Sequence, residues 1–152
     1  MSNHSLEESK RAGPKPKQKR VVLLGCSLTG KTALFYTLGR GESPQTVTSF
    51  KVSQASVLPK GCGKKVELVD VPGHEQFKRE AEAKLTHASG IIYVVDASTR
   101  DMIYKAALDL YDYLVLKSLQ RLAIPMLIVA NKQDLDSSVD KEGLVKQLER
   151  EM

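Results

Sequence analysis

Apolar runs alternate with segments of helical periodicity from Arg20 onward, without internal repeats. The run at 20–24 predicts a first strand, and the continuous apolar runs at 90–96 and 125–130 are typical of central strands covered on both faces. Between these two, residues 102–120 place apolar side chains at near-helical spacing, which predicts one helix. The alternation favours an α/β fold with a mostly parallel central sheet and helices on both faces.

The remaining pattern predicts a hairpin and two further helices. Residues 52–58 and 64–71 are expected to be strands joined by a glycine-rich turn, and helices are expected at 32–38 and 141–151. A doubly wound domain would continue with another strand and helix, so we expect this sheet to lack its last strand and helix.

Charge divides the chain into two parts. Residues 1–20 hold six basic and two acidic side chains, a net charge of +4 out of +5 for all 152 residues. We interpret residues 1–19 as a disordered basic tail and residues 20–152 as one C-terminally incomplete domain. The tail either lies against anionic lipid or RNA or is a solvated leader. The nearly neutral remainder gives no reason to expect direct DNA binding, and no apolar stretch is long enough to span a bilayer.

A glycine-rich segment at 25–32 directly follows the first predicted strand and precedes a predicted helix, as in a phosphate-binding loop. Backbone N–H groups can converge there on phosphate oxygens, and the helix adds its positive end. The Lys31 ammonium would lie near the terminal phosphates, and the Thr32 hydroxyl can coordinate Mg²⁺. The residues expected to hold the nucleotide here are Gly25, Ser27, Leu28, Thr29, Gly30, Lys31, Thr32 and Ala33.

Neither cysteine has metal-ligand or disulfide spacing, which favours a reducing compartment. Cys26, inside the phosphate loop, is interpreted either as a redox-sensitive thiol or, preferably, as a small residue that fills the loop.

Two more segments carry metal and phosphate chemistry. Asp70 ends a predicted strand, so its carboxylate would lie at the sheet edge beside the phosphate loop and hold Mg²⁺, through water. Gly73 follows three residues later, where its N–H could contact a γ-phosphate. Thr46 and Thr48 are both candidates for a second hydroxyl ligand of Mg²⁺; we favour Thr48 because more loop is available to reach over the phosphates.

Residues 131–134, Asn-Lys-Gln-Asp, follow the last predicted strand and have the chemistry to select guanine. The Asp134 carboxylate can accept hydrogen bonds from N1 and the exocyclic amine, a donor pair that adenine does not offer. Asn131 could tie this segment to the phosphate loop, and the Lys132 stem can cover the base plane.

His74 directly follows Gly73, where an imidazole could orient a water molecule for hydrolysis. The alternative is a surface histidine that points away until a partner arrives.

These segments together resemble the small GTPase superfamily of P-loop proteins over about residues 20–152. Asn-Lys-Gln-Asp-Leu at 131–135 is similar to the Arf-like branch, whereas Pro-Gly-His at 72–74 is similar to translation factors. With Thr-Val-Thr-Ser at 46–49, the combination most resembles the beta-subunit family of the signal recognition particle receptor.

The resemblance implies a GTP- and Mg²⁺-binding partner of the receptor's alpha subunit at the cytoplasmic face of the endoplasmic reticulum membrane, with the ribosome or translocon as further partners in co-translational targeting. Hydrolysis is expected to be slow or dependent on a partner. Such proteins usually carry an N-terminal membrane helix and a final base-contacting loop. We find neither in this sequence, so we expect membrane association only indirectly or through a segment outside it, and a cytosolic protein if the sequence is complete.

Two alternatives stay open. One is an Arf-like regulatory GTPase that hydrolyses GTP in membrane trafficking, with His74 positioning water. The other is an inactive fragment that folds poorly.

Overall fold

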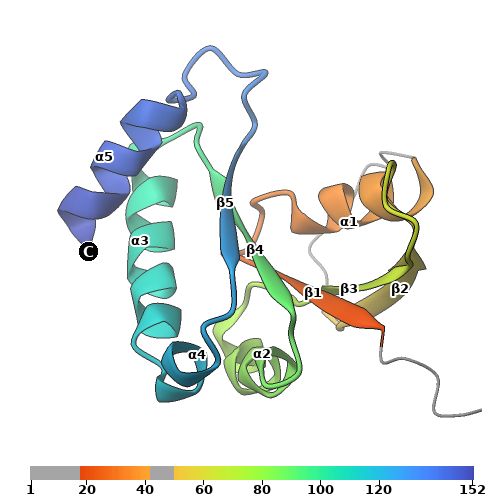
Figure 1. Cartoon of the computed structure of the whole chain (residues 1–152). Helices are drawn as coiled ribbons and strands as arrows, with labels where there is room; N and C mark the ends of the chain where they lie inside the picture. The colour runs from red at the N-terminus through yellow and green to blue at the C-terminus, as the bar shows by residue number, and fades with distance from the viewer. Residues whose placement is uncertain (1–17, 42–49) are drawn as a thin grey trace, which may run out of the picture.

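The sheet places the starts and the ends of its parallel strands at opposite edges (Figure 1). The computed structural model describes residues 18–41 and 50–152. In these residues one five-stranded sheet has the order β2-β3-β1-β4-β5, with only β2 antiparallel to its neighbour. The strands are β1 (Lys19–Leu24), β2 (Ser53–Val57), β3 (Val66–Asp70), β4 (Gly90–Asp96) and β5 (Met126–Asn131).

Helices cover both faces of this sheet (Figure 1). They are α1 (Lys31–Arg40), the short 3-10 helix η2 (Glu75–Phe77), α2 (Lys78–Leu85), α3 (Arg100–Leu114), α4 (Lys117–Leu122) and α5 (Lys141–Glu151). Because side chains alternate along a strand, Val22 and Leu24 face the larger core with α2, α3, α4 and α5, whereas Leu23 faces a smaller core with Phe35 of α1. The continuous apolar run of β4 is buried on both faces, as predicted, whereas the prediction is wrong for β5, which pairs only with β4 among the described residues and leaves Leu127 and Ile128 exposed.

The strand register fixes which residues meet at the carboxyl edge. Leu23 of β1 pairs with Asp70 of β3, and Asp96 of β4 pairs with Asn131 of β5. The segments that follow these strands therefore emerge at one rim of the sheet, although they are separated by tens of residues in sequence.

The helix predicted at 102–120 is wrong as a single element, because α3 and α4 are separated at Val115 and Leu116. Leu116 has an extended backbone, with φ −64° and ψ 120°. The predicted apolar stripe included Leu114, but this residue ends α3 and is 42% exposed. The buried positions on either side of the break are Tyr113 in α3 and Leu119 in α4. The break turns the second segment so that Leu119 packs on the larger core.

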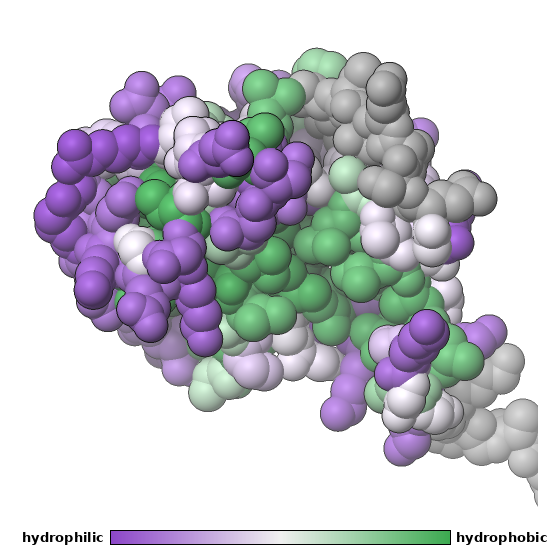
Figure 2. Space-filling view, turned by 90° about the horizontal axis from the view of Figure 1, so that it is seen from above, coloured by the Kyte–Doolittle hydropathy of each residue, from purple (hydrophilic) through white to green (hydrophobic). Residues whose placement is uncertain are grey.

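Part of the apolar surface is exposed. Figure 2 shows apolar residues gathered in the middle of the face seen from above, with hydrophilic residues to their left. In the described residues β5 pairs only with β4, and its Leu127 and Ile128 are 60% and 41% exposed. None of the described helices has the length and hydrophobicity required to cross a bilayer.

Candidate functional site

The conformation of the phosphate loop depends on two glycines, because their backbone dihedral angles are unfavourable for other residues. Gly25 has φ +134°, and a Cβ on it would lie 2.2 Å from the Val94 carbonyl oxygen of β4. Gly30 has φ +91°, and a Cβ there would lie 2.3 Å from the Asn131 amide nitrogen. Both positions combine a positive φ with close approach of another segment, so an alanine would be strained and would clash at either one.

Inside this loop, the Cys26 carbonyl oxygen accepts two hydrogen bonds. The Thr29 hydroxyl donates from 3.0 Å and the Lys31 ammonium donates from 2.6 Å. Lys31 is only 5% exposed, and this burial lowers its pKa, while the nearby Asp70 carboxylate opposes the decrease. The loop therefore positions one buried cation at the start of α1.

Thr32 and Asp70 form a pair suited to a divalent cation. The Thr32 hydroxyl donates to Oδ2 of Asp70 at 2.8 Å. Asp70 is fully buried, and among the described residues its Oδ1 has no hydrogen-bond partner. Burial raises the pKa of Asp70, although the Thr32 hydrogen bond and Lys31 oppose the increase. A buried carboxylate oxygen without a donor, beside a hydroxyl, fits the oxygen ligands that Mg²⁺ prefers.

Gly73 brings the segment after β3 against the phosphate loop. A Cβ on Gly73 would lie 2.3 Å from the Gly25 carbonyl oxygen and 2.5 Å from the Ser27 nitrogen. The two backbones are therefore in direct contact, and only glycine fits between them. Movement of either segment must be accommodated by the other.

Asn131 joins the segment after β5 to the phosphate loop. Its amide nitrogen donates to the Thr29 carbonyl oxygen at 2.7 Å, across 102 residues of sequence. The next residue, Lys132, has a positive φ of 63° and places its ammonium 2.5 Å from Oδ2 of Asp96. Burial by itself would raise the pKa of Asp96, but hydrogen bonds from Lys132 and Ser98 outweigh it and lower that pKa.

Asp134 lies on the exposed part of the same rim loop. The loop is held by hydrogen bonds from the Ser138 hydroxyl to the Lys132 carbonyl oxygen at 2.5 Å and from the Gln133 amide to the Val139 carbonyl oxygen at 2.9 Å. The carboxylate that we expect to select guanine therefore lies on a loop held by these hydrogen bonds. This loop is at the same rim of the sheet as Lys31.

The other predicted residues are placed as follows. Ser27 and Ala33 are half-buried, and Leu28 is 68% exposed with a positive φ of 65°. Thr46 and Thr48 lie outside the described residues.

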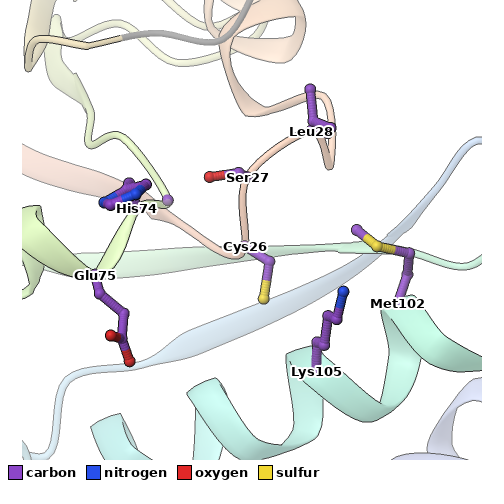
Figure 3. A pocket seen from close by; sticks show the side chains of 8 residues that line it. Cys26, Ser27, Leu28, His74, Glu75, Met102 and Lys105 are labelled. Atoms are coloured by element: carbon purple, nitrogen blue, oxygen red, sulfur yellow. The ribbon is translucent and has the colours of Figure 1, made fainter.

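A cavity of about 520 Å³ opens beside the phosphate loop and the segment after Gly73 (Figure 3). His74 is exposed at this cavity, and its Nδ1 accepts a hydrogen bond from the Gln76 backbone N–H at 3.3 Å, which caps η2. The Cys26 sulfur points into the same space, and Lys105 of α3 points up toward it (Figure 3). Burial raises the pKa of the Cys26 thiol, which disfavours a reactive thiolate and supports the loop-filling interpretation.

Sequence reasoning missed two parts of this site. Asp96, which pairs with Lys132, ends an apolar strand just as Asp70 does, so its position at a strand end was an available signal. Lys105 and Met102 of α3 also line the cavity, and their helical spacing alone gave no sign of it.

Comparison with known proteins shows the family of this chain. Residues 16–152 match the family model described as signal recognition particle receptor beta subunit. The signal recognition particle receptor subunit beta of Dictyostelium discoideum is 36% identical over 134 residues, which are 87% of this chain and 46% of that protein. Human ADP-ribosylation factor-like protein 4C is 32% identical over 131 residues, covering 84% of this chain and 67% of that protein.

Solved structures give the same fold. The mammalian SRP receptor has a TM-score of 0.78 at 29% identity, covering 88% of this chain and 72% of the matched chain. The Arl6 BBS3 small GTPase of Trypanosoma brucei, solved with a bound nucleotide analogue, has a TM-score of 0.76 at 20% identity, covering 88% and 78%. The chain spans about half the length of the curated beta-subunit relatives, 46% in Dictyostelium discoideum and 52% in rat.

Proposed function

Because this chain belongs to the signal recognition particle receptor beta subunit family, we propose that it is a GTP-dependent binding module that docks the receptor's alpha subunit. GTP would lie along the rim, with its phosphates in the 25–32 loop and its base at 131–134. The observation that carries this proposal is the hydrogen bond between Asn131 and Thr29, which joins the base segment directly to the phosphate loop.

Mg²⁺ would be held by Thr32 and Asp70, with Thr48 as a further proposed ligand. When bound, such a cation would neutralise negative charge on the phosphates. The fit rests on the unpartnered Oδ1 of Asp70 and the adjacent Thr32 hydroxyl within the described residues.

Docking of the alpha subunit would follow from loop ordering. A γ-phosphate contacted by the Gly73 N–H would hold the segment after β3 against the phosphate loop, where the two backbones already touch. We place this event at the cytoplasmic face of the endoplasmic reticulum membrane, in co-translational targeting, with the ribosome or translocon as additional partners.

A second candidate function is GTP hydrolysis of the Arf-like kind. It is favoured by the position of His74 at the same cavity as Ser27 and Gly73. Single-turnover hydrolysis by wild type and His74→Ala separates the two functions. A loss of about 100-fold in the isolated variant would support an enzyme in which His74 positions the attacking water, whereas equal slow rates would support the binding module.

Nucleotide-dependent thermal protection tests the primary proposal. GTP at about 100 times its Kd stabilises a one-site protein by about 2.7 kcal/mol, and ATP at the same concentration should give no protection. Asp134→Asn should transfer the protection from GTP to xanthosine triphosphate, because the variant amide can donate to the additional carbonyl oxygen of xanthine.

Asp136→Asn is the matched control, since it removes an exposed carboxylate from the same loop. It should retain GTP protection. Equal protection of wild type by ATP and GTP, or no protection by any nucleotide, would contradict the proposal.

A further inference from the structure

Four exposed lysines gather at the sheet edge opposite the rim. Lys60, Lys64 and Lys65 lie in the connection between β2 and β3, and Lys19 begins β1. We call this group the basic pole. Among residues 18–41 and 50–152, no carboxylate lies within ion-pair distance of any of the four ammonium groups.

The strand register brings these lysines together. Lys19 is the direct partner of Val66 in the parallel β1–β3 pair, so Lys65 lies beside the point where the chain enters β1. The Gln18 amide also donates to the Ser56 hydroxyl of β2 at 2.7 Å, which ties the entering chain across β3 to the hairpin. The hairpin connection and the start of β1 are therefore one surface.

Glu67, an acidic residue in β3 next to Val66, is paired with a cation of its own. Glu67 accepts a hydrogen bond from the Arg20 guanidinium at 2.7 Å, and both side chains line a hollow of about 620 Å³ with Gln18, His87, Ala88 and Ser89. The pair leaves the four lysines as the uncompensated charge. In sequence, Gln18 is preceded by a segment with four basic and two acidic side chains.

An exposed apolar side chain distinguishes lipid from nucleic acid as the partner. Leu58, directly after β2 and two residues before Lys60, is 62% exposed. Lysines around an exposed leucine suit a bilayer interface. There the lysine ammonium groups contact anionic headgroups, and the leucine side chain contacts the acyl chains. RNA readers usually add aromatic side chains or arginine for stacking on bases; the connection at 58–65 has neither, and Arg20 is paired with Glu67.

We propose that the basic pole and Leu58 form a surface that binds anionic phospholipid membranes and leaves the nucleotide rim facing away from the bilayer. This adds a lipid contact to the membrane location proposed above and does not depend on nucleotide binding. Each lysine near an anionic surface contributes an attraction that corresponds to about a fivefold change in partitioning.

The test is flotation of the full 152-residue chain with vesicles of equal parts phosphatidylcholine and phosphatidylserine. Lys64→Gln with Lys65→Gln should reduce vesicle binding by about 25-fold. The matched control, Lys141→Gln with Lys146→Gln, removes the same charge from exposed positions of α5 and should change binding by less than about twofold. Leu58→Ser should cause a several-fold loss that persists at high salt.

Several results would overturn this proposal: equal losses in the two double variants, equal binding of wild type to vesicles of phosphatidylcholine alone, or binding to polyuridine RNA but not to vesicles. Thermal unfolding checks that each variant is folded. GTP protection measured on the same variants keeps the two proposals apart, because a failed lipid contact leaves that protection unchanged.

Discussion

Single glycines decide how closely the backbones of the rim approach one another. Gly25 lies against the Val94 carbonyl of β4, and Gly73 lies against the phosphate loop. At both positions the neighbouring atoms are backbone, which cannot move aside as the end of a flexible side chain does. Their replacement therefore tests the packing of the rim directly.

We expect Gly25→Ala to lower the free energy of unfolding by about 3 kcal/mol or more, since it adds a severe clash to the cost of a positive φ. Gly61→Ala is the control, because Gly61 has φ +76° but no atom within 4 Å of its added Cβ. It should lose only about 1–2 kcal/mol. Urea denaturation measures both, and equal losses would mean that the contact with Val94 costs nothing.

The buried Asp70 carboxylate lowers the stability of the ligand-free protein, although the same carboxylate is the proposed ligand of Mg²⁺. Burial raises the pKa of Asp70, so the carboxyl group holds its proton more tightly in the folded protein than in the unfolded chain. Protonation of Asp70 therefore stabilises the fold fully at pH values below the ordinary pKa of the unfolded chain. This stabilisation is lost as the pH rises through the higher pKa of the folded protein. Asp70→Asn should therefore stabilise the ligand-free protein by about 1 kcal/mol at neutral pH and remove the Mg²⁺-dependent part of GTP protection.

Thermal unfolding across pH tests this expectation. The stabilising effect should shrink toward acid pH, where the wild-type carboxyl is already neutral. Asp136→Asn, at an exposed position, should leave stability unchanged. A destabilised Asp70→Asn variant at neutral pH would show that the charged form is the one the fold favours.

Residue types and spacing were sufficient to predict which segments meet at the rim but not all the contacts between them. Strand ends locate Asp70 and Asn131, since a parallel sheet gathers such ends at one edge. The pairing of Lys132 with Asp96 depends on a backbone φ of 63° that no local propensity encodes. The roles that we assign to the rim residues in binding nucleotide, Mg²⁺ and water, including those of His74 and Asp134, stay predictions.

At the scale of elements, a polar network that runs from the buried Tyr93 to the partly exposed Lys78 joins α2 and α3 to β4. The Tyr93 hydroxyl donates to Oδ2 of Asp109 at 2.7 Å, and its oxygen also lies 3.1 Å from the Ala106 carbonyl oxygen. Lys78 of α2 lies 2.5 Å from Asp112 and 3.7 Å from Asp109. The segment that begins at Gly73 continues through η2 into α2, which starts at Lys78. The contacts of Lys78 therefore hold the C-terminal end of this segment.

Tyr93→Phe should lower the free energy of unfolding by about 1–3 kcal/mol, because it removes the hydroxyl that donates to the half-buried Asp109 carboxylate. Tyr111→Phe, at a 48% exposed position of α3, should change it by less than about 0.5 kcal/mol. A double-mutant cycle with Lys78→Met, followed by urea denaturation, measures the coupling. Strict additivity would mean that β4 and α2 are not linked through Asp109.

The pattern of hydrophobic residues predicted strands better than helix ends. Continuous apolar runs are unambiguous in β4 and β5, which are central to the prediction of a parallel sheet. The division between α3 and α4 involves neither glycine nor proline, so local signals gave no warning of it. It follows from packing, because Tyr113 and Leu119 are both buried only if the chain turns between them.

At the scale of the whole molecule, β5 is an edge strand with apolar side chains, since in the part of the chain that the structure describes it pairs only with β4. Leu127 and Ile128 are exposed there, and an unpaired strand edge invites pairing with another chain. We expect the chain to associate increasingly with concentration, and Leu127→Lys to suppress this several-fold. Leu38→Lys, at a 49% exposed position of α1, should not. Sedimentation velocity over a concentration series measures association; equal suppression by both variants would assign it to net charge.

The separation of strand starts from strand ends also has an electrical consequence. The basic pole lies at one edge, and Asp134, Asp136 and Asp140 follow β5 at the other. Charges of opposite sign at the two ends of a small body give it a permanent dipole moment. Near a negatively charged sheet of lipid, this moment produces a torque that turns the molecule before contact, so that a random collision becomes an oriented one.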